Sequence, residues 1–247
     1  AVGSAPAYPV GMIDPRPAMA ALAAGRGVPF HVDACLGGLL LPFLERLGYR
    51  VPAWDFRVSG VTSISADVHK YGYAIKGASV VLHRPKANLR YQVFQFADWP
   101  GGLYGTQAFL GTKPAAPIAA AWAVLHYLGE EGYLRFAREA MDATRRLIAG
   151  IEATPGLHVW GEPDMTVLAV GSHERDIFAV GDVLSARGWH FDRQENPRAI
   201  HLMVSPRHAR VIDTFLADLR DAVVAAAASS DTVASYGDDV RAEARGE

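Results

Sequence analysis

The stretch VTSISADVHKYGYAIKGASVVLH, residues 61–83, contains two β-rich runs on either side of a polar loop. Residues 61–67 and 78–83 are rich in β-branched and apolar side chains. Residues 69–77 hold two glycines among aromatic and basic side chains. The pattern predicts two neighbouring strands joined by this loop, with the polar groups placed just after the first strand ends.

A third strand is predicted upstream, where the apolar run VPFHVD (28–33) closes on the carboxylate of Asp33. Segments 18–25 and 39–48 flank it and read as helices, each ending at a glycine that stops a helix. Alternation of helices with apolar strands favours an α/β fold with a mainly parallel sheet. In such sheets ligands bind at the carboxyl ends of the strands.

A domain boundary is predicted within the long helical segment 117–153, which is interrupted at Gly129 and Gly132. Beyond it, short apolar runs alternate with helical ones, which indicates a small α+β domain. Its expected strands are 157–161, 165–171 and 201–205, and its expected helices are 176–187 and 207–227. The predicted parts of the chain are the C-terminal part of a large domain (1–130), this small domain (131–228) and a polar tail expected to be disordered (229–247).

Bulk properties exclude several classes of protein. The chain has 247 residues and a net charge of −2, which gives no general attraction to nucleic acid or anionic lipid. Cys35 is its one cysteine, so an internal disulfide is excluded and a cytoplasmic location is expected. The sequence has no run of about 18 apolar residues, so no membrane span is predicted. Because the first residues lack a methionine and a signal pattern, we expect the sequence to start inside a longer polypeptide.

The polar residues at the predicted strand ends form a pattern that no single one of them would establish. A strand-end Asp33 is commonly a loop hydrogen-bonding group, His31 a hydrogen-bonded core residue, and Lys70 a solvated loop residue. Together they suit Schiff-base chemistry. Such a lysine must be partly neutral, and the neighbouring cationic groups His69 and Lys76 favour that state. A buried carboxylate such as Asp33 would hold the proton on the ring nitrogen of a pyridine cofactor.

HVDACLGG (31–38) and GVTSISADVHKYGYAIKGASVVL (60–82) resemble the sphingosine-1-phosphate lyases, a branch of the pyridoxal-phosphate (PLP) dependent group II decarboxylase family. The similarity continues through DWPGGLYGTQAFLGTKP (98–114) and GEEGY (129–133) to about residue 220. It implies PLP-dependent transferase fold type I and a homodimer, because active sites of this class form between subunits.

The resemblance also implies roles for single residues. Lys70 would carry PLP as a Schiff base and Asp33 would pair with the pyridine nitrogen. The remaining cofactor-binding residues implied are Ala34, His69, Gly111 and Thr112. Lys76 and Tyr73 are implied as catalytic residues, and Tyr71 and Tyr104 as substrate-binding residues. A core aromatic position remains an equal alternative for Tyr104.

The implied reaction is a retro-aldol cleavage of a phosphorylated long-chain (sphingoid) base to a fatty aldehyde and phosphoethanolamine. Lys70, Lys76 and a tyrosine all stay open as the general base. Two features depart from the family pattern. The glycine-rich phosphate loop and the ring-stacking histidine expected before residue 31 are missing, and Ile75 stands where many lyases have proline. If these 247 residues were the whole polypeptide, we would expect poor PLP binding and no activity.

Two other functions remain open. An amino-acid decarboxylase of the same superfamily would use Asp33 and Lys70 in the same way. An inactive PLP-fold fragment would serve only as a dimerisation or partner-binding module. A metal site is not predicted, because the nine histidines lack ligand spacing, and no G-x-S-x-G motif indicates a serine hydrolase.

Overall fold

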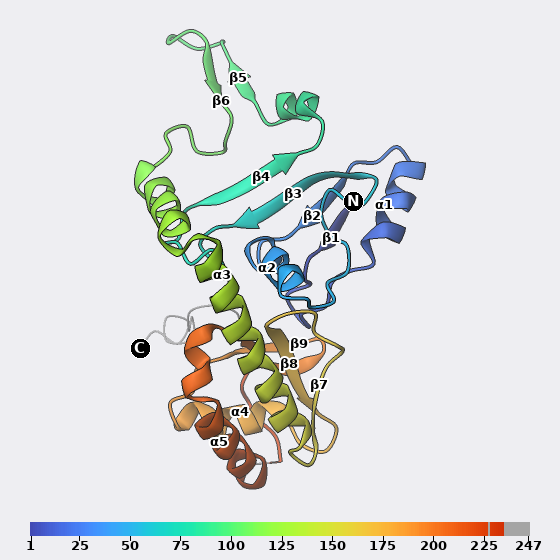
Figure 1. Cartoon of the computed structure of the whole chain (residues 1–247), viewed down its shortest axis with the longest axis vertical. Coiled ribbons are helices and arrows are strands. Elements are labelled where there is room, and N and C mark those ends of the chain that lie inside the picture. Colours follow the sequence, from blue (N-terminus) through green and yellow to red (C-terminus); the bar gives the residue numbers. More distant parts are fainter. Residues whose placement is uncertain (227, 235–247) are drawn as a thin grey trace. The chain divides into compact units, whose positions relative to one another are not determined.

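The computed structural model describes residues 1–226 and 228–234. These divide into two compact units (Figure 1). Unit 1 consists of Ala1–Ala5 and Ile13–Tyr133. Unit 2 consists of Pro6–Met12 together with the chain from Leu134 onward. The division follows Tyr133, whereas the sequence pattern placed it after residue 130. That pattern also gave no sign that Pro6–Met12 would join the second unit.

Unit 1 is built on a four-stranded sheet in the order β1-β2-β3-β4. β1 (Val2–Ser4), β2 (Phe30–Asp33) and β3 (Val61–Asp67) are parallel, and β4 (Ser79–His83) is antiparallel to β3. The sheet is therefore mainly parallel, as predicted. Its first strand was missed, because three residues are too few to show a periodic pattern.

The helices of unit 1 differ from the predicted segments, since α1 begins two residues before the predicted 18–25 and the second helix is shorter than predicted. α1 spans Arg16–Gly25 and begins beside Pro15. The segment expected to be one helix over 39–48 is divided into a 3-10 turn, Gly37–Leu39, and α2, Leu41–Arg46. Pro42 lies in the first turn of α2, where its missing N–H costs no helical hydrogen bond.

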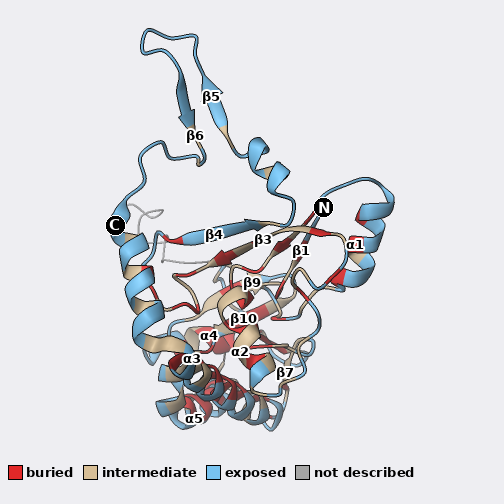
Figure 2. Cartoon of the chain, turned by 45° about the horizontal axis from the view of Figure 1, so that its top comes forward, coloured by how far each residue is buried: buried red, intermediate tan, exposed pale blue. Residues whose placement is uncertain are grey.

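A hairpin follows a 3-10 turn at Lys86–Tyr91 and stands clear of the sheet in two views (Figures 1 and 2). Its strands are β5 (Phe94–Phe96) and β6 (Tyr104–Thr106), which pair antiparallel. No strand was predicted here. Nearly all of the hairpin is exposed, including several large apolar side chains (Figure 2).

The helix α3 covers Ala115–Glu152 and belongs to unit 1 up to Tyr133. Its backbone is not helical at Gly129, where φ is +55°. Side chains other than glycine rarely adopt this conformation, so Gly129 allows the break predicted at this position. The second predicted interruption is wrong, because the chain is helical at Gly132.

Unit 2 has an antiparallel sheet in the order β7-β8-β10-β9. The strands are β7 (Leu157–Val159), β8 (Val167–Ser172), β9 (Asp192–Glu195) and β10 (Arg198–Met203). Its helices are α4 (Ile177–Ala186), a 3-10 turn (Pro206–Arg210) and α5 (Ile212–Ala225). This is the α+β arrangement predicted, apart from β9, whose sequence DRQE carries no strand signal.

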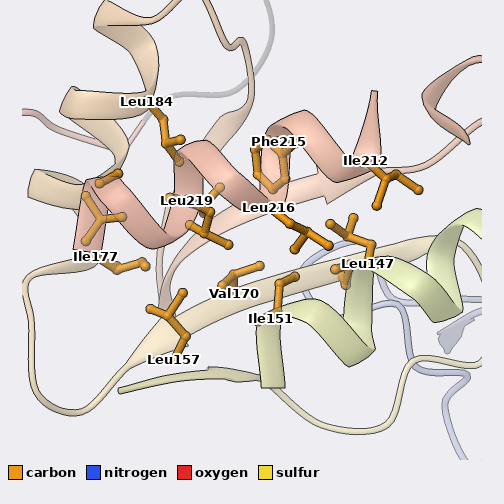
Figure 3. Packing of buried hydrophobic residues seen from close by; sticks show 14 of the residues in the cluster. Leu147, Ile151, Leu157, Val170, Ile177, Leu184, Ile212, Phe215, Leu216 and Leu219 are labelled. Carbon is orange, nitrogen blue, oxygen red and sulfur yellow. The ribbon is translucent and has the colours of Figure 1, made fainter. Parts of the chain in front are cut away.

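The core of unit 2 joins its sheet to three helices (Figure 3). Leu147 and Ile151 come from α3, Val170 from β8, and Leu219 from α5. These side chains are almost fully removed from water. Burial of apolar area, at roughly 25 cal/mol per Å², is therefore the main stabilising contribution in this unit.

The described part of the polar tail bonds to the α4 region. Residues 228–234 have no helix or strand, but Ser230 N–H donates to Asp176 at 2.9 Å and the Thr232 hydroxyl donates to Asp182 at 2.8 Å. The predicted disorder of the tail stays a prediction. Residues 235–247 lie outside the described residues.

Replacing Leu219 with alanine is expected to lower the free energy of unfolding by about 2–5 kcal/mol, because it leaves a cavity in this core. Val224→Ala, on the exposed side of the same helix, is the control and should change it by less than about 0.5 kcal/mol. Chemical denaturation measures both. Equal losses for the two variants would contradict the core packing described.

Candidate active site

Asp33, the last residue of β2, is half-buried and held by neighbouring groups. Its Oδ1 accepts hydrogen bonds from the Cys35 backbone N–H at 3.0 Å and from the Ser65 hydroxyl at 3.3 Å. Burial raises the pKa of Asp33, but the bonds from Cys35 and Ser65 and the charge of Lys70 outweigh it, and the pKa lies below 3.8. Asp33 is therefore an ionised acceptor at neutral pH.

A β-bulge decides which side chains of β3 lie beside this carboxylate. Phe30 pairs with Val61, but the next residue, His31, pairs with Ser63, so Thr62 is the additional residue. The Thr62 hydroxyl donates to the Phe30 carbonyl at 2.9 Å. Bulges commonly redirect side chains near active sites, and this one changes which residues of β3 face His31.

Past the bulge the two strands stay in register, with Asp33 opposite Ser65. Asp67 follows Ser65 by two residues, so both point to the same face of the sheet. β3 ends at Asp67, and Lys70 lies in the turn that follows. Neighbouring parallel strands thus deliver the aspartate of one and the lysine of the other to the same edge of the sheet.

Lys70 is anchored to Asp67 twice. Its Nζ lies 3.1 Å from Asp67 Oδ2, and its backbone N–H donates to the Asp67 carbonyl at 3.2 Å. His69 Nε2 lies 3.7 Å from the same carboxylate oxygen, and the Ser79 hydroxyl donates to the other. Burial raises the pKa of Asp67, but Ser79, Lys70 and His69 together bring this pKa below 3.8. An anion therefore faces the lysine amine.

Asp33 and Lys70 follow from neighbouring parallel strands and lie at the same edge of the sheet, since β2 ends at Asp33 and Lys70 lies in the turn after β3. These are the two residues on which the predicted chemistry depends. His69, also predicted, adjoins them through Asp67, and its Nδ1 lies 3.1 Å from the Ala78 carbonyl.

The loop after Lys70 is held by a tyrosine from α3. The Tyr133 hydroxyl donates to the Gly72 carbonyl at 2.8 Å, and its ring lies 6.3 Å from that of Tyr73. Tyr73 has a φ of +59°, which is rare for a residue other than glycine. Tyr71 is buried within unit 1, and its implied role in substrate binding stays a prediction.

Two further predicted residues differ in exposure. Lys76 is exposed, and no described residue forms a hydrogen bond or ion pair with it. Ala34 is fully buried. The roles implied for Lys76 and Ala34 stay predictions.

Tyr104, Gly111 and Thr112 lie on the exposed hairpin and the segment after it. Tyr104 packs edge-on against Phe94 at 6.4 Å but stays exposed, so it is not a core aromatic. A side chain at Gly111 would approach the Tyr104 hydroxyl to 2.3 Å, which shows that these two predicted residues lie next to each other. No contact with Asp33 or Lys70 is observed within the described chain.

Ser65, Cys35 and Ser79 contact the two carboxylates and were not predicted as site residues. A signal for Ser65 was available, because Ser63, Ser65 and Asp67 are spaced by two residues along a predicted strand. The part played by Ser79 follows from the antiparallel pairing of β4 with β3, which the sequence does not specify.

Neither a metal site nor a membrane-spanning helix is found among residues 1–226 and 228–234. No group of three or more histidine, cysteine, aspartate or glutamate side chains could hold a metal ion there. None of the helices in this part of the chain is both long and apolar enough to cross a bilayer.

Residues 10–170 match the family model of the pyridoxal-dependent decarboxylase conserved domain. The chain belongs to this family. The match covers Asp33 and Lys70, and the cofactor of the family is pyridoxal 5′-phosphate. The residues present fit the cofactor, because they supply a primary amine and an ionised carboxylate at one sheet edge.

Among curated relatives, the chain is similar to sphingosine-1-phosphate lyases. It is 48% identical over 222 residues to the one from Arabidopsis thaliana and 44% identical over 225 residues to sphingosine-1-phosphate lyase 1 from Rattus norvegicus. Each alignment covers 90% of this chain, but only 41% and 40% of the relative. The chain therefore spans about two fifths of the length of these proteins.

Solved structures give the same picture of the fold. Sphingosine-1-phosphate lyase from Burkholderia pseudomallei superposes with a TM-score of 0.86 at 44% identity, over 91% of this chain and 52% of that one. Glutamate decarboxylase from Lactobacillus brevis superposes with a TM-score of 0.74 at 24% identity, over 90% of this chain and 54% of that one. The predicted α/β fold of PLP-dependent enzymes, present in part, is confirmed.

The lowered pKa of Asp67 has a consequence for stability. A carboxylate with a folded pKa below 3.8 stabilises the fold above this pH, and the contribution is lost as pH falls through the folded pKa. Asp67→Asn should therefore be less stable than the unsubstituted chain at pH 7, by about 1–3 kcal/mol, and the difference should shrink below pH 3.8. Denaturation at a series of pH values measures it.

Asp98→Asn is the matched control, since Asp98 is exposed and forms no hydrogen bond or ion pair with a described residue. A stability difference between Asp67→Asn and the unsubstituted chain that stays constant from pH 7 to pH 3 would contradict this assignment.

Proposed function

We propose that this chain carries the lysine-bearing part of a PLP-dependent lyase that cleaves a phosphorylated sphingoid base to a fatty aldehyde and phosphoethanolamine. The observation that carries the proposal is the placement of Lys70 and the ionised Asp33 at the ends of neighbouring parallel strands. Similarity to sphingosine-1-phosphate lyases at 44–48% identity supports this reaction.

In this proposal Lys70 holds the cofactor as a Schiff base and Asp33 keeps the proton on its ring nitrogen. The bound cofactor supplies an electron sink for the carbon–carbon cleavage. Asp33 is suited to its part because its hydrogen bonds favour the charged carboxylate, so that it accepts the ring N–H rather than taking its proton.

Asp67 has the task of orienting the amine. Its Oδ2 lies within reach of both Lys70 Nζ and His69 Nε2, so a proton released by the lysine has a carboxylate and an imidazole close by. Lys70 is also one candidate for the general base that takes the proton of the 3-hydroxyl, with Lys76 and Tyr73 as the others. His69 and Lys76 are the candidate cations for the phosphate of the substrate.

A homodimer is part of the proposal. Large apolar side chains stay exposed on the hairpin, on the segment after it and on the first half of α3, including Leu103, Phe109, Trp122 and Tyr127. Soluble proteins rarely leave such a surface open to water, which supports a second copy of the protein as the group that covers it. A cytoplasmic location also remains a prediction.

The assay is release of fatty aldehyde from a phosphorylated sphingoid base by the protein with PLP. Lys70→Ala should reduce the rate by about 10²–10⁴-fold, since the amine takes part in the chemistry. Asp33→Asn should reduce it roughly 10- to 100-fold, because a charge-assisted bond is lost. Lys86→Ala, at an exposed lysine outside the site, is the control and should keep the rate.

The family match to pyridoxal-dependent decarboxylases supports a second candidate, an amino-acid decarboxylase with the same two residues in the same roles. Release of carbon dioxide from amino acids without aldehyde from the sphingoid base would favour it. Absence of both products in a protein that is folded and supplied with PLP would contradict the proposed function and favour a non-catalytic module.

A further inference from the structure

Next to Asp33, three side chains from β2 and β3 form a continuous row of hydrogen bonds. Ser63 Oγ lies 2.8 Å from His31 Nδ1, and His31 Nε2 lies 3.1 Å from Ser65 Oγ. Ser65 Oγ then donates to Asp33 Oδ1 at 3.3 Å. The row runs along one face of the two strands, because His31 is paired with Ser63 and Asp33 with Ser65.

The direction of every proton in the row follows from the ionised carboxylate of Asp33 at one end and the neutral ring of His31. An ionised carboxylate only accepts, so the single hydroxyl proton of Ser65 points to Asp33. The Ser65 oxygen must then accept from His31, which places the ring proton on Nε2. Nδ1 of a neutral ring is left as an acceptor, so the Ser63 hydroxyl donates to it.

This arrangement of protons requires a neutral His31 ring, and the pKa of His31 agrees with it. Burial lowers its pKa, the charge of Asp33 raises it but is outweighed, and His83 lowers it further. The ring is therefore neutral at pH 7. A charged ring would donate from both nitrogens and could not accept from Ser63.

We propose that His31 and Ser65 are positioning residues. Their hydrogen bonds, aligned along Ser63–His31–Ser65, orient the carboxylate of Asp33 toward the cofactor ring and stabilise its ionised form. This rests on the proposed role of Asp33 as partner of the pyridine nitrogen. Donors that point the same way polarise one another, so each bond strengthens the next.

The bulge at Thr62 is what makes the row continuous. With regular pairing, His31 would lie opposite Thr62 and Asp33 opposite Ile64, an apolar residue. The additional residue instead brings a serine opposite each of the two polar residues of β2. The bulge, the neutral histidine and the two serines therefore belong to one arrangement.

The first test is nitrogen NMR of the chain with isotope-labelled histidine, with the His31 signals assigned by their loss in His31→Gln. At pH 7 we expect His31 to be neutral, with the proton on Nε2. A proton on Nδ1, or a charged ring, would overturn the proposal. This measurement requires no folded serine variant and no bound cofactor.

The second test is the pKa of Asp33 from carbon NMR of its carboxyl group. Ser65→Ala should raise this pKa and release His31 from its single tautomer, while Ser65→Thr should preserve both. His31→Phe should raise the pKa of Asp33 by a smaller amount. Ser59→Ala, at an exposed serine, is the matched control and should leave the pKa of Asp33 unchanged.

An Asp33 pKa equal in Ser65→Ala and the control would overturn the proposal. If the pKa of Asp33 changes in Ser65→Ala but not in His31→Phe, the proposed positioning role of His31 is wrong. With PLP added, Ser65→Ala should weaken cofactor retention by about tenfold. If the protein that carries this chain together with the phosphate loop expected before residue 31 binds no PLP, the proposed function is contradicted, while the NMR results still decide whether the hydrogen-bond row exists.

Discussion

Parallel pairing of β2 with β3, in register from His31 onward, is the constraint on which the site depends. It places Asp33 beside Ser65 and brings the ends of both strands to one edge of the sheet. A shift by one residue would turn Ser65 and Asp67 to the opposite face. Buried Val61, Ile64 and Ala66 prevent such a shift, because it would expose the apolar side of β3.

Two carboxylates with lowered pKa values share this edge and have different partners. Asp33 accepts hydrogen bonds from neutral donors, and its interaction with Lys70 is electrostatic, without a hydrogen bond. Asp67 makes a direct ion pair with Lys70. Asp67 therefore holds the lysine, while Asp33 keeps a carboxylate oxygen available as an acceptor. This arrangement suits a cofactor that binds to an amine at one end and to a ring partner at the other.

The sequence predicted the strands that carry the site better than their surroundings. The strand 61–67 was predicted with the bounds that β3 has, because its β-branched residues end at a polar group. β1 and β9 were missed, since the first is too short and the second too polar to show a pattern. The bulge at Thr62 was also missed, because it depends on how two strands align.

The same limit applies to the site residues. Asp33, His69 and Lys70 could be selected because strand ends meet at one sheet edge, a property of the fold class. The exposure of Lys76 and the burial of Ala34 and Tyr71 depend on packing between segments far apart in sequence. Hydrogen-bond partners such as Ser79 depend on strand direction, which local sequence does not encode.

The central claim is that a single amine, on Lys70, binds the aldehyde of a cofactor whose ring is held by Asp33. Reduction of the PLP-treated protein with borohydride, followed by peptide mass spectrometry, tests it most directly. The account predicts a covalent cofactor adduct on Lys70, with visible absorption that changes in Asp33→Asn. An adduct on Lys76, Lys86 or Lys113 instead, or none on Lys70, would contradict it.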